Sequence, residues 1–315
     1  MLQILVNPQF DFVRWRRWAY VISAVAILIG LAHITYSGGL RYGIDFSGGT
    51  LLQVRFERPT TVDDVRAALA RVQAGESIIQ GFGDAQEYLI RVPVGSHTLE
   101  EISKRIDGGL RQAGLPGFEV RRLEFVGPQV GRDLQWDAVQ AVLWGMVGIL
   151  IYTAMRFDFK GGVAAILALL HDVVIALGAM SIAHREMSLP VLAALLTIVG
   201  FSINDTIVTF DRIRENRGRG LRRGETLGDV INAAINQTLS RTILTSLTVF
   251  LVVVVLFIFG GEVLRDFAFV LLVGVIAGTY STIFVAAPII LDWENWSQAG
   301  QRGGKKTVVK AGAGR

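Results

Sequence analysis

The chain has 315 residues, of which 51% are hydrophobic and 18% are charged, and its mean hydropathy is +0.46. Since a soluble domain of this length does not need so large an apolar excess, the composition favours a membrane protein. Cysteine is absent, which excludes disulfides and thiolate metal sites.

Six apolar runs are long enough to cross a bilayer, which takes about 20 residues of helix. They cover residues 18–36, 139–155, 163–182, 189–210, 239–259 and 267–291. The first run is not typical of a cleaved signal peptide, because its small-x-small site lies inside the apolar core. We therefore predict a polytopic α-helical membrane protein, with transmembrane helix 1 at 18–36 and helices 2 to 6 within 136–291.

Lysine and arginine gather on one side of the predicted bundle. The amino end (1–17), the links after the second and fourth spans, and the tail (292–315) are rich in them, whereas Arg185 and Arg265 are alone in their links. By the positive-inside rule, both termini are cytoplasmic. The net charge of +4 thus reflects membrane topology rather than nucleic-acid binding, and the glycine-rich tail is predicted to be disordered.

A polar segment, 37–135, separates the first two spans and falls on the outer, periplasmic side. It contains "TLLQVRF" (50–56), which alternates as a half-buried strand does, then a helical pattern and a hairpin around Gly-Phe-Gly-Asp. A second helical pattern and the strand "FEVRRLEFV" (118–126) complete the segment. The order strand, helix, strand, strand, helix, strand predicts an α+β, ferredoxin-like domain.

The fourth span contains a carboxylate, Asp205, in the stretch "TIVGFSINDTIVTF" (197–210). A charge in the middle of a bilayer costs about 2.5–3.5 kcal/mol on insertion scales, so such a residue usually has a use. At 1.5 Å per residue, Asp205 lies about 9 Å inside Asp211, in the cytoplasmic part of the hydrocarbon layer.

Polar residues form a stripe on each of two consecutive predicted helices. In the fourth span, where Asn204 also flanks Asp205, the shared face carries Ser202, Asp205, Thr206 and Thr209, and the fifth span carries Thr238, Arg241, Thr242, Thr245 and Thr248 at similar spacing. Polar faces in a membrane turn toward protein or water rather than lipid. We therefore predict that Asp205 pairs with Arg241 across the two antiparallel helices.

Two interpretations of that pair are open, a static ion pair that joins two helices and a working proton site. Arg241 alone is also compatible with a snorkelling, positive-inside residue. Burial disfavours a charged aspartate whereas a nearby arginine favours it, so a small shift of Arg241 would switch Asp205 between its charged and protonated forms.

The third span contains His171 and Asp172, which have either a proton-relay or a structural role. Adjacent helical residues point about 100° apart, so we expect the two not to share one narrow face. One histidine without a second ligand at helical spacing is a poor metal site. Small residues in two spans, Gly274 with Gly278 and Gly145 with Gly148, predict close helix packing.

Known catalytic motifs are largely missing from the sequence. It has no G-x-x-x-x-G-K-[ST], which argues against ATP hydrolysis, and no G-x-S-x-G elbow. Asp172 and Asp205 meet the carboxylate count of an intramembrane aspartyl protease, but neither has the Gly-x-Gly-Asp context. That protease stays as one alternative, and a proton-driven pump for lipid or small molecules is another.

Four motifs in order resemble the SecD/SecF family of the bacterial Sec protein-export system, over about residues 10–295. They are "YGIDFSGGT" (42–50), "GPQVGRDL" (127–134), "GFSINDTIVTFDRIREN" (200–216) and "NQTLSRTILTSL" (236–247). The chain matches the SecF half of this family, so a separate SecD is implied.

The resemblance implies one six-helix half of a transporter of the RND superfamily, in the bacterial inner membrane. The implied partners are SecD, the SecYEG channel, YajC and the translocating preprotein, with SecA acting indirectly from the cytoplasm. The implied role is to use the proton motive force on the outer side, with Asp205 and Arg241 as proton-path residues. Protons are the coupling ion, and no other cofactor and no enzyme activity are implied.

Overall fold

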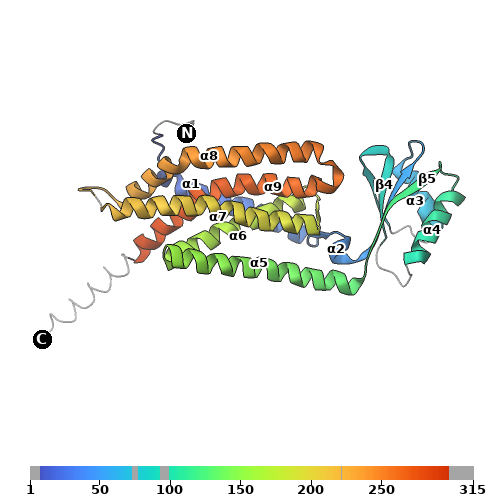
Figure 1. Ribbon diagram of the computed structural model, residues 1–315, viewed down its shortest axis with the longest axis horizontal. Helices are drawn as coiled ribbons and strands as arrows, with labels where there is room; N and C mark the ends of the chain where they lie inside the picture. The colour runs from blue at the N-terminus through green and yellow to red at the C-terminus, as the bar shows by residue number, and fades with distance from the viewer. Residues whose placement is uncertain (1–7, 73–76, 93–98, 221, 298–315) are drawn as a thin grey trace.

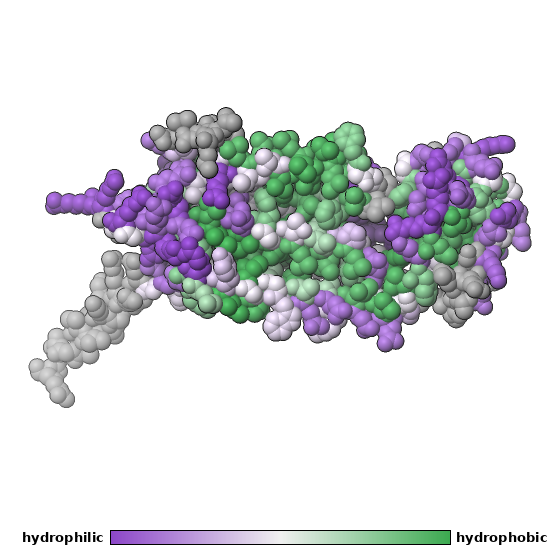
Figure 2. All heavy atoms as spheres, in the orientation of Figure 1, coloured by the Kyte–Doolittle hydropathy of each residue, from purple (hydrophilic) through white to green (hydrophobic). Residues whose placement is uncertain are grey.

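The computed structural model describes residues 8–72, 77–92, 99–220 and 222–297. Long helices lie side by side in one bundle, and a small α+β domain projects from one end of it (Figure 1). Six of these helices are long and apolar enough to cross a membrane, so the predicted polytopic fold is confirmed. Figure 2 shows the hydrophobic band over the bundle, with hydrophilic residues at both ends.

The first five spanning helices are longer than the apolar runs that predicted them. They are α1 (Phe12–Tyr36), α5 (Pro128–Arg156), α6 (Phe159–Ile182), α7 (Leu189–Gly218) and α8 (Leu227–Phe259), and the sixth span continues beyond α9 (Gly261–Ser281). A π-helical turn, η1 (Thr282–Ala286), follows α9 within a sixth span that extends over Leu264–Ser297.

Three predicted borders therefore fall inside helices. The helices α1 and α5 begin at Phe12 and Pro128, before the predicted starts at 18 and 136, and residues 292–297 are helical rather than part of a disordered tail. Polar turns continue each helix beyond its apolar run, and Asp11 caps α1 by accepting from the Arg14 amide. The rest of the predicted tail, 298–315, and residues 1–7 lie outside the described residues.

The outer domain has the predicted order of elements: β2 (Gly49–Phe56), α3 (Val62–Arg71), β3 (Ile78–Phe82), β4 (Asp84–Val92), α4 (Leu99–Gln112) and β5 (Phe118–Val126). The four strands form one antiparallel sheet in the order β3-β4-β2-β5. Buried side chains of β2, such as Val54 and Phe56, pack with Leu69 of α3 and Ile106 of α4 in a core separate from that of the bundle.

Two short strands and a short helix, which together form the base of the outer domain, join this domain to the bundle. They were not predicted from the sequence. Strand β1 (Arg41–Tyr42) pairs in parallel with β6 (Glu186–Met187), which lies in the link between α6 and α7. The turn from α2 (Ile44–Ser47) into β2 uses Gly48 and Gly49, whose φ angles of 72° and 130° favour glycine. A Cβ on Gly49 would also lie 2.7 Å from the Val92 carbonyl oxygen, so this glycine pair has a structural role.

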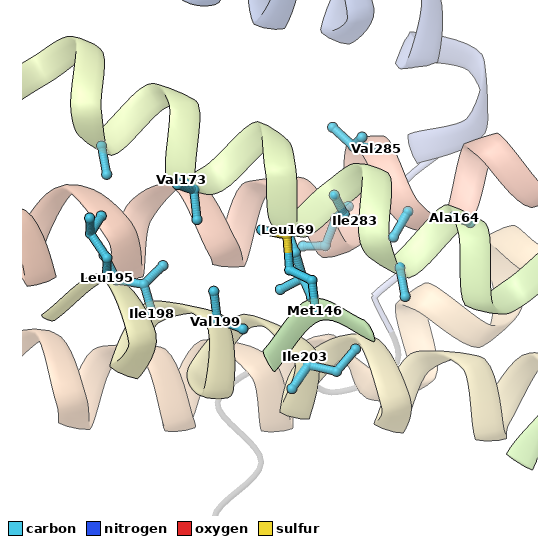
Figure 3. Close-up of a cluster of buried hydrophobic side chains, with 14 of the residues drawn as sticks. Met146, Ala164, Leu169, Val173, Leu195, Ile198, Val199, Ile203, Ile283 and Val285 are labelled. Atoms are coloured by element: carbon cyan, nitrogen blue, oxygen red, sulfur yellow. The ribbon is translucent and has the colours of Figure 1, made fainter. Parts of the chain in front are cut away.

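The core of the bundle is apolar and comes from several spans. Met146 of α5, Leu169 and Val173 of α6, Ile198 of α7 and Ile283 of η1 belong to one cluster of buried side chains (Figure 3).

Glycines allow two helix pairs to approach closely. A Cβ on Gly178 of α6 would lie 2.8 Å from the Gly30 Cα of α1. Gly274 and Gly278 of α9 face α7, where an added Cβ would meet Ile198 at 2.1 Å or Ser202 at 3.1 Å, so close packing there is confirmed. The prediction for Gly145 and Gly148 was wrong, because both are exposed and no heavy atom of another element lies within 4 Å of an added Cβ.

We expect Gly178→Ala to lower the unfolding temperature of the protein in detergent, because the new methyl group would contact a backbone atom that cannot move aside. Overpacking of this kind costs about 1–3 kcal/mol. The matched control is Gly145→Ala, where space is open and alanine favours the helix by about 1 kcal/mol. Equal unfolding temperatures for the two variants would contradict the close α1–α6 contact.

Candidate functional site

Asp205 is buried between α7 and α8, with 3% of its surface exposed. The hydroxyls of Thr245 and Ser246 of α8 lie 3.4 Å from its Oδ1 and 3.5 Å from its Oδ2, and the Thr245 hydroxyl is closer, at 3.0 Å, to carbonyl oxygens of its own helix. Hydroxyl hydrogen bonds usually span about 2.5–3.0 Å, so both contacts with Asp205 are long. The Thr279 hydroxyl of α9 lies 2.7 Å from Ser246 Oγ and 2.7 Å from the Val275 carbonyl oxygen. The carboxylate is thus buried and weakly held, with hydroxyl groups as its partners.

The predicted ion pair between Asp205 and Arg241 was wrong. No salt bridge within 4.0 Å joins these two described residues, and Arg241 is exposed. It lines a surface hollow at the cytoplasmic end of α7 and α8, together with Asp211 and Glu215. Thr245 is the α8 residue level with Asp205, and Arg241 comes one helical turn, about 5.4 Å, before it.

The predicted polar face of α7 is buried, as expected. Ser202, Asp205, Thr206 and Thr209 are each at most 3% exposed. Their partners, however, lie on different helices. Ser202 donates to Asp172 of α6 at 2.6 Å, and Thr206 contacts Thr282 of η1 at 3.1 Å. Asn204 is exposed and points away from this face.

The polar stripe of α8 divides into buried and exposed members. Thr238 and Thr242 are buried, and Thr238 donates to the carbonyl groups of its own helix. Thr245 is half-buried and contacts Asp205, whereas Arg241 and Thr248 are exposed. One face of α8 thus contacts α7, and the rest of the stripe does not.

His171 and Asp172 meet, against the expectation that their side chains point apart. The imidazole Nδ1 lies 2.8 Å from Asp172 Oδ1, because the two side chains turn toward each other from adjacent positions. Asp172 is fully buried, and its Oδ2 accepts from Ser202 at 2.6 Å and from Ser281 at 2.8 Å. This carboxylate, unlike Asp205, has close partners.

Sequence reasoning missed several residues of this polar core. Ser23 of α1 lies 3.0 Å from His171 Nε2, and Tyr280 stacks on the imidazole with 6.0 Å between ring centres. Ser246 and Ser281 contact the two aspartates. The run "TYST" (279–282) in an otherwise apolar span was the available signal. Among the described residues, no cluster of three or more His, Asp or Glu side chains could hold a metal ion.

Comparisons with known proteins agree on one family. The family profile "Protein export membrane protein SecD/SecF, C-terminal" matches residues 110–296, and the "SecD/SecF GG Motif" matches 37–60. The protein translocase subunit SecF of Magnetococcus marinus is 48% identical over 296 residues, which cover 92% of this chain and 94% of that protein. The subunit of the same name from Escherichia coli O157:H7 is 38% identical, and the match covers 90% of this chain and 87% of that protein.

A solved structure supports the same assignment. The crystal structure of SecDF from Thermus thermophilus, described as a translocon-associated membrane protein, matches with a TM-score of 0.81 and 39% identity. The match covers 92% of this chain and 39% of the SecDF chain, so this chain corresponds to one part of that longer protein. On the profiles, the relatives and the shared fold together, the chain belongs to the SecD/SecF family of protein-export membrane proteins.

Proposed function

We propose that the chain acts as the SecF subunit of the Sec machinery and, with SecD, uses the proton motive force to assist preprotein translocation. Family membership supports the role of an accessory subunit in Sec protein export. Assistance takes place on the outer side of the SecYEG channel, after SecA-driven insertion, and YajC is a further partner. The chain itself needs no enzyme activity and no cofactor, since protons are the coupling ion.

The observation that carries the proton-coupled part is the environment of Asp205. A buried carboxylate needs close hydrogen bonds or an ion pair to stay charged at low cost. Asp205 has two hydroxyl groups at 3.4 and 3.5 Å and, in the part of the chain that the structure describes, no arginine within ion-pair distance. Protonation removes the charge and turns the carboxyl group into a donor toward those hydroxyls, so the contact between α7 and α8 differs between the two states.

Arg241 has a supporting role on the cytoplasmic side. It lines the polar hollow between α7 and α8, one turn from the residues that contact Asp205. A positive charge there favours the charged form of Asp205 and repels a proton that enters from the cytoplasm. The residue therefore acts through its field along the proton path rather than by direct contact.

Movement of α7 can reach the outer domain through the base. The Leu189 amide, at the start of α7, donates to Asp45 of α2 at 2.8 Å. Just before α7, Glu186 of β6 accepts from Arg91 Nη1 of β4 at 2.7 Å, and a second guanidinium nitrogen completes a two-pronged ion pair. The helix that holds Asp205 thus has its own link to the outer domain, besides the chain connections through α1 and α5.

The topology supports a place in the bacterial inner membrane with both termini cytoplasmic. Arg16, Arg156 and Arg217 all lie at the bundle end opposite the outer domain, where they pair with acidic residues of other helices. Positive charge at this end agrees with the positive-inside rule.

The alternatives receive less support. A static ion pair that joins the two helices requires the Asp205–Arg241 contact, which is not formed. An intramembrane aspartyl protease requires two carboxylates that share one site, but Asp172 is held by α7 and α9 hydroxyls whereas Asp205 faces α8. A pump for lipid or small molecules is disfavoured by the family, whose relatives are translocase subunits.

We expect Asp205→Asn to reduce export of a secreted reporter about tenfold or more in cells with no other copy of the chain. Asparagine keeps the size and polarity of the side chain but cannot exchange a proton. One charge that crosses 100 mV supplies about 2.3 kcal/mol, and about 1.4 kcal/mol is a tenfold change in rate. Membrane levels and SecD association are measured in parallel. The control is Asp137→Asn, at an exposed carboxylate of α5, and normal export by the Asp205 variant would contradict the proposal.

The link between Arg91 and Glu186 allows a charge-swap test. We expect Arg91→Glu to slow export, because two carboxylates would then meet at the base, and Arg91→Glu with Glu186→Arg to restore it. Coupling energies between contacting residues are about 0.5–3 kcal/mol. Arg66→Glu, at an exposed arginine elsewhere in the outer domain, is the control. A double variant that exports no better than Arg91→Glu would show that this contact does not transmit the movement.

A further inference from the structure

A second buried polar cluster lies deeper in the bundle than Asp205 and joins four helices. Its members are Ser23 of α1, His171 and Asp172 of α6, Ser202 of α7, and Tyr280 and Ser281 of α9. The cluster is distinct from the Asp205 contacts, which go to α8. Its hydrogen bonds form a chain in which each hydroxyl has one proton to donate, so the contacts limit how many protons the cluster can hold.

The Tyr280 hydroxyl donates its one proton to the Ala19 carbonyl oxygen, at 2.8 Å. In the 3.3 Å contact between Ser23 Oγ and Tyr280, Ser23 is therefore the donor. The one proton of Ser23 serves a single acceptor at a time. While Ser23 donates to Tyr280, the 3.0 Å contact with His171 needs a proton on Nε2, and while Ser23 donates to His171, Nε2 is an acceptor without a proton.

The contact between the other ring nitrogen, Nδ1, and Asp172 also needs a proton. Asp172 Oδ2 accepts from Ser202 and Ser281, and the 2.8 Å contact between His171 Nδ1 and Asp172 Oδ1 needs a proton between those two atoms. With Ser23 donating to Tyr280, the pair holds two protons, either as imidazolium with carboxylate or as imidazole with carboxylic acid. With Ser23 donating to His171, the pair holds one proton, as neutral histidine beside a charged aspartate. The same side-chain positions therefore fit two states that differ by one proton.

We propose that the His171–Asp172 pair is a second proton-binding site within the membrane. When the pair releases one proton to a water molecule, the remaining proton stays on Nδ1, which donates to the Asp172 carboxylate. Nε2 then has no proton and becomes an acceptor. The Ser23 hydroxyl then turns from Tyr280 to His171, so the Ser23–Tyr280 bond between α1 and α9 breaks while a Ser23–His171 bond remains. The pair is thus a two-state element at the contact between α1 and its neighbours.

This inference deepens the proposed function, since it rests on proton-driven export and adds a site through which protons act. The helix α1 leads directly into the outer domain through β1. Tyr280 is the titratable side chain that contacts His171 from α9, and the contacts from α1 and α7 are the hydroxyls of Ser23 and Ser202. On α7, Asp205 faces α8, and among the described contacts of the pair there is no lysine or arginine.

Nitrogen NMR of the chain labelled with ¹⁵N-histidine, in complex with SecD, tests the proton count directly. The chain has 4 histidines, and His171→Gln identifies the signal of interest. We expect Nε2 of His171 to carry a proton at acidic pH and to lose it at alkaline pH. In Asp172→Asn the amide can donate to Nδ1, so we expect Nε2 to stay protonated throughout. A bare Nε2 at every pH, or one that stays protonated at every pH in the wild-type chain, would overturn the proposal.

Export in cells supplies the functional readout. Asp172→Asn retains donors and acceptors for the whole cluster but cannot release the proton, so we expect export to fall to the level of cells without the chain. Membrane level, unfolding temperature and SecD association should stay normal. The matched control is His33→Gln, which alters another α1–α6 contact, 2.9 Å from His33 Nδ1 to Ser181 Oγ, that contains no carboxylate. Normal export by Asp172→Asn would overturn the proposal.

Asp205→Asn, measured in the same assay, separates this inference from the proposed function. Defective Asp205→Asn with normal Asp172→Asn would leave proton-driven export in place and remove the second site. Normal Asp205→Asn with defective Asp172→Asn would make the His171–Asp172 pair the proton site of this chain. If Asp172→Asn does not accumulate in the membrane, the nitrogen measurement on the wild-type chain decides.

Discussion

The structure depends on how two buried carboxylates are accommodated inside an apolar bundle. In an apolar bundle, an ionised group is stable only with close partners, and otherwise it binds a proton. Asp172 has an imidazole and two serine hydroxyls within 2.8 Å. Asp205 has two hydroxyls at 3.4 Å or more. Asp172 therefore belongs to a network of close hydrogen bonds that can hold a proton. The charge of Asp205, in contrast, is poorly compensated.

The same polar contacts organise the helices around them. Asp172 joins α6 to α7 and α9, and Asp205 joins α7 to α8, so α7 takes part in both. Close glycine contacts bring α1 against α6 and α9 against α7. Because α7 also begins at the base of the outer domain, next to β6, this one helix carries Asp205, contacts Asp172 through Ser202 and reaches the part of the molecule outside the membrane. A helix in that position is suited to turn a change of protonation into movement of the domain.

Periodicity in the sequence predicted what each element would be, and it predicted less about how elements meet. Apolar runs and the strand-helix order gave six spans and an outer α+β domain, and the three-residue spacing of Ser202 and Asp205 correctly placed both on a buried face. The partner of Asp205 was mispredicted because spacing along one helix does not determine the axial register of its neighbour, which here sets Thr245 rather than Arg241 level with it. The π-turn after Ser281 and the β1–β6 pair depend on contacts between distant segments, which a local pattern does not contain.

The central claim is that Asp205 exchanges protons with the two sides of the membrane. The most direct test is proton uptake by proteoliposomes that contain the chain together with SecD, under an imposed proton gradient, for the wild-type chain and for Asp205→Asn at equal protein content. We expect uptake above that of empty liposomes for the wild-type complex and a loss of this excess in the variant. Equal uptake by the two complexes would contradict it, and Asp205 would then be a structural residue of the α7–α8 contact.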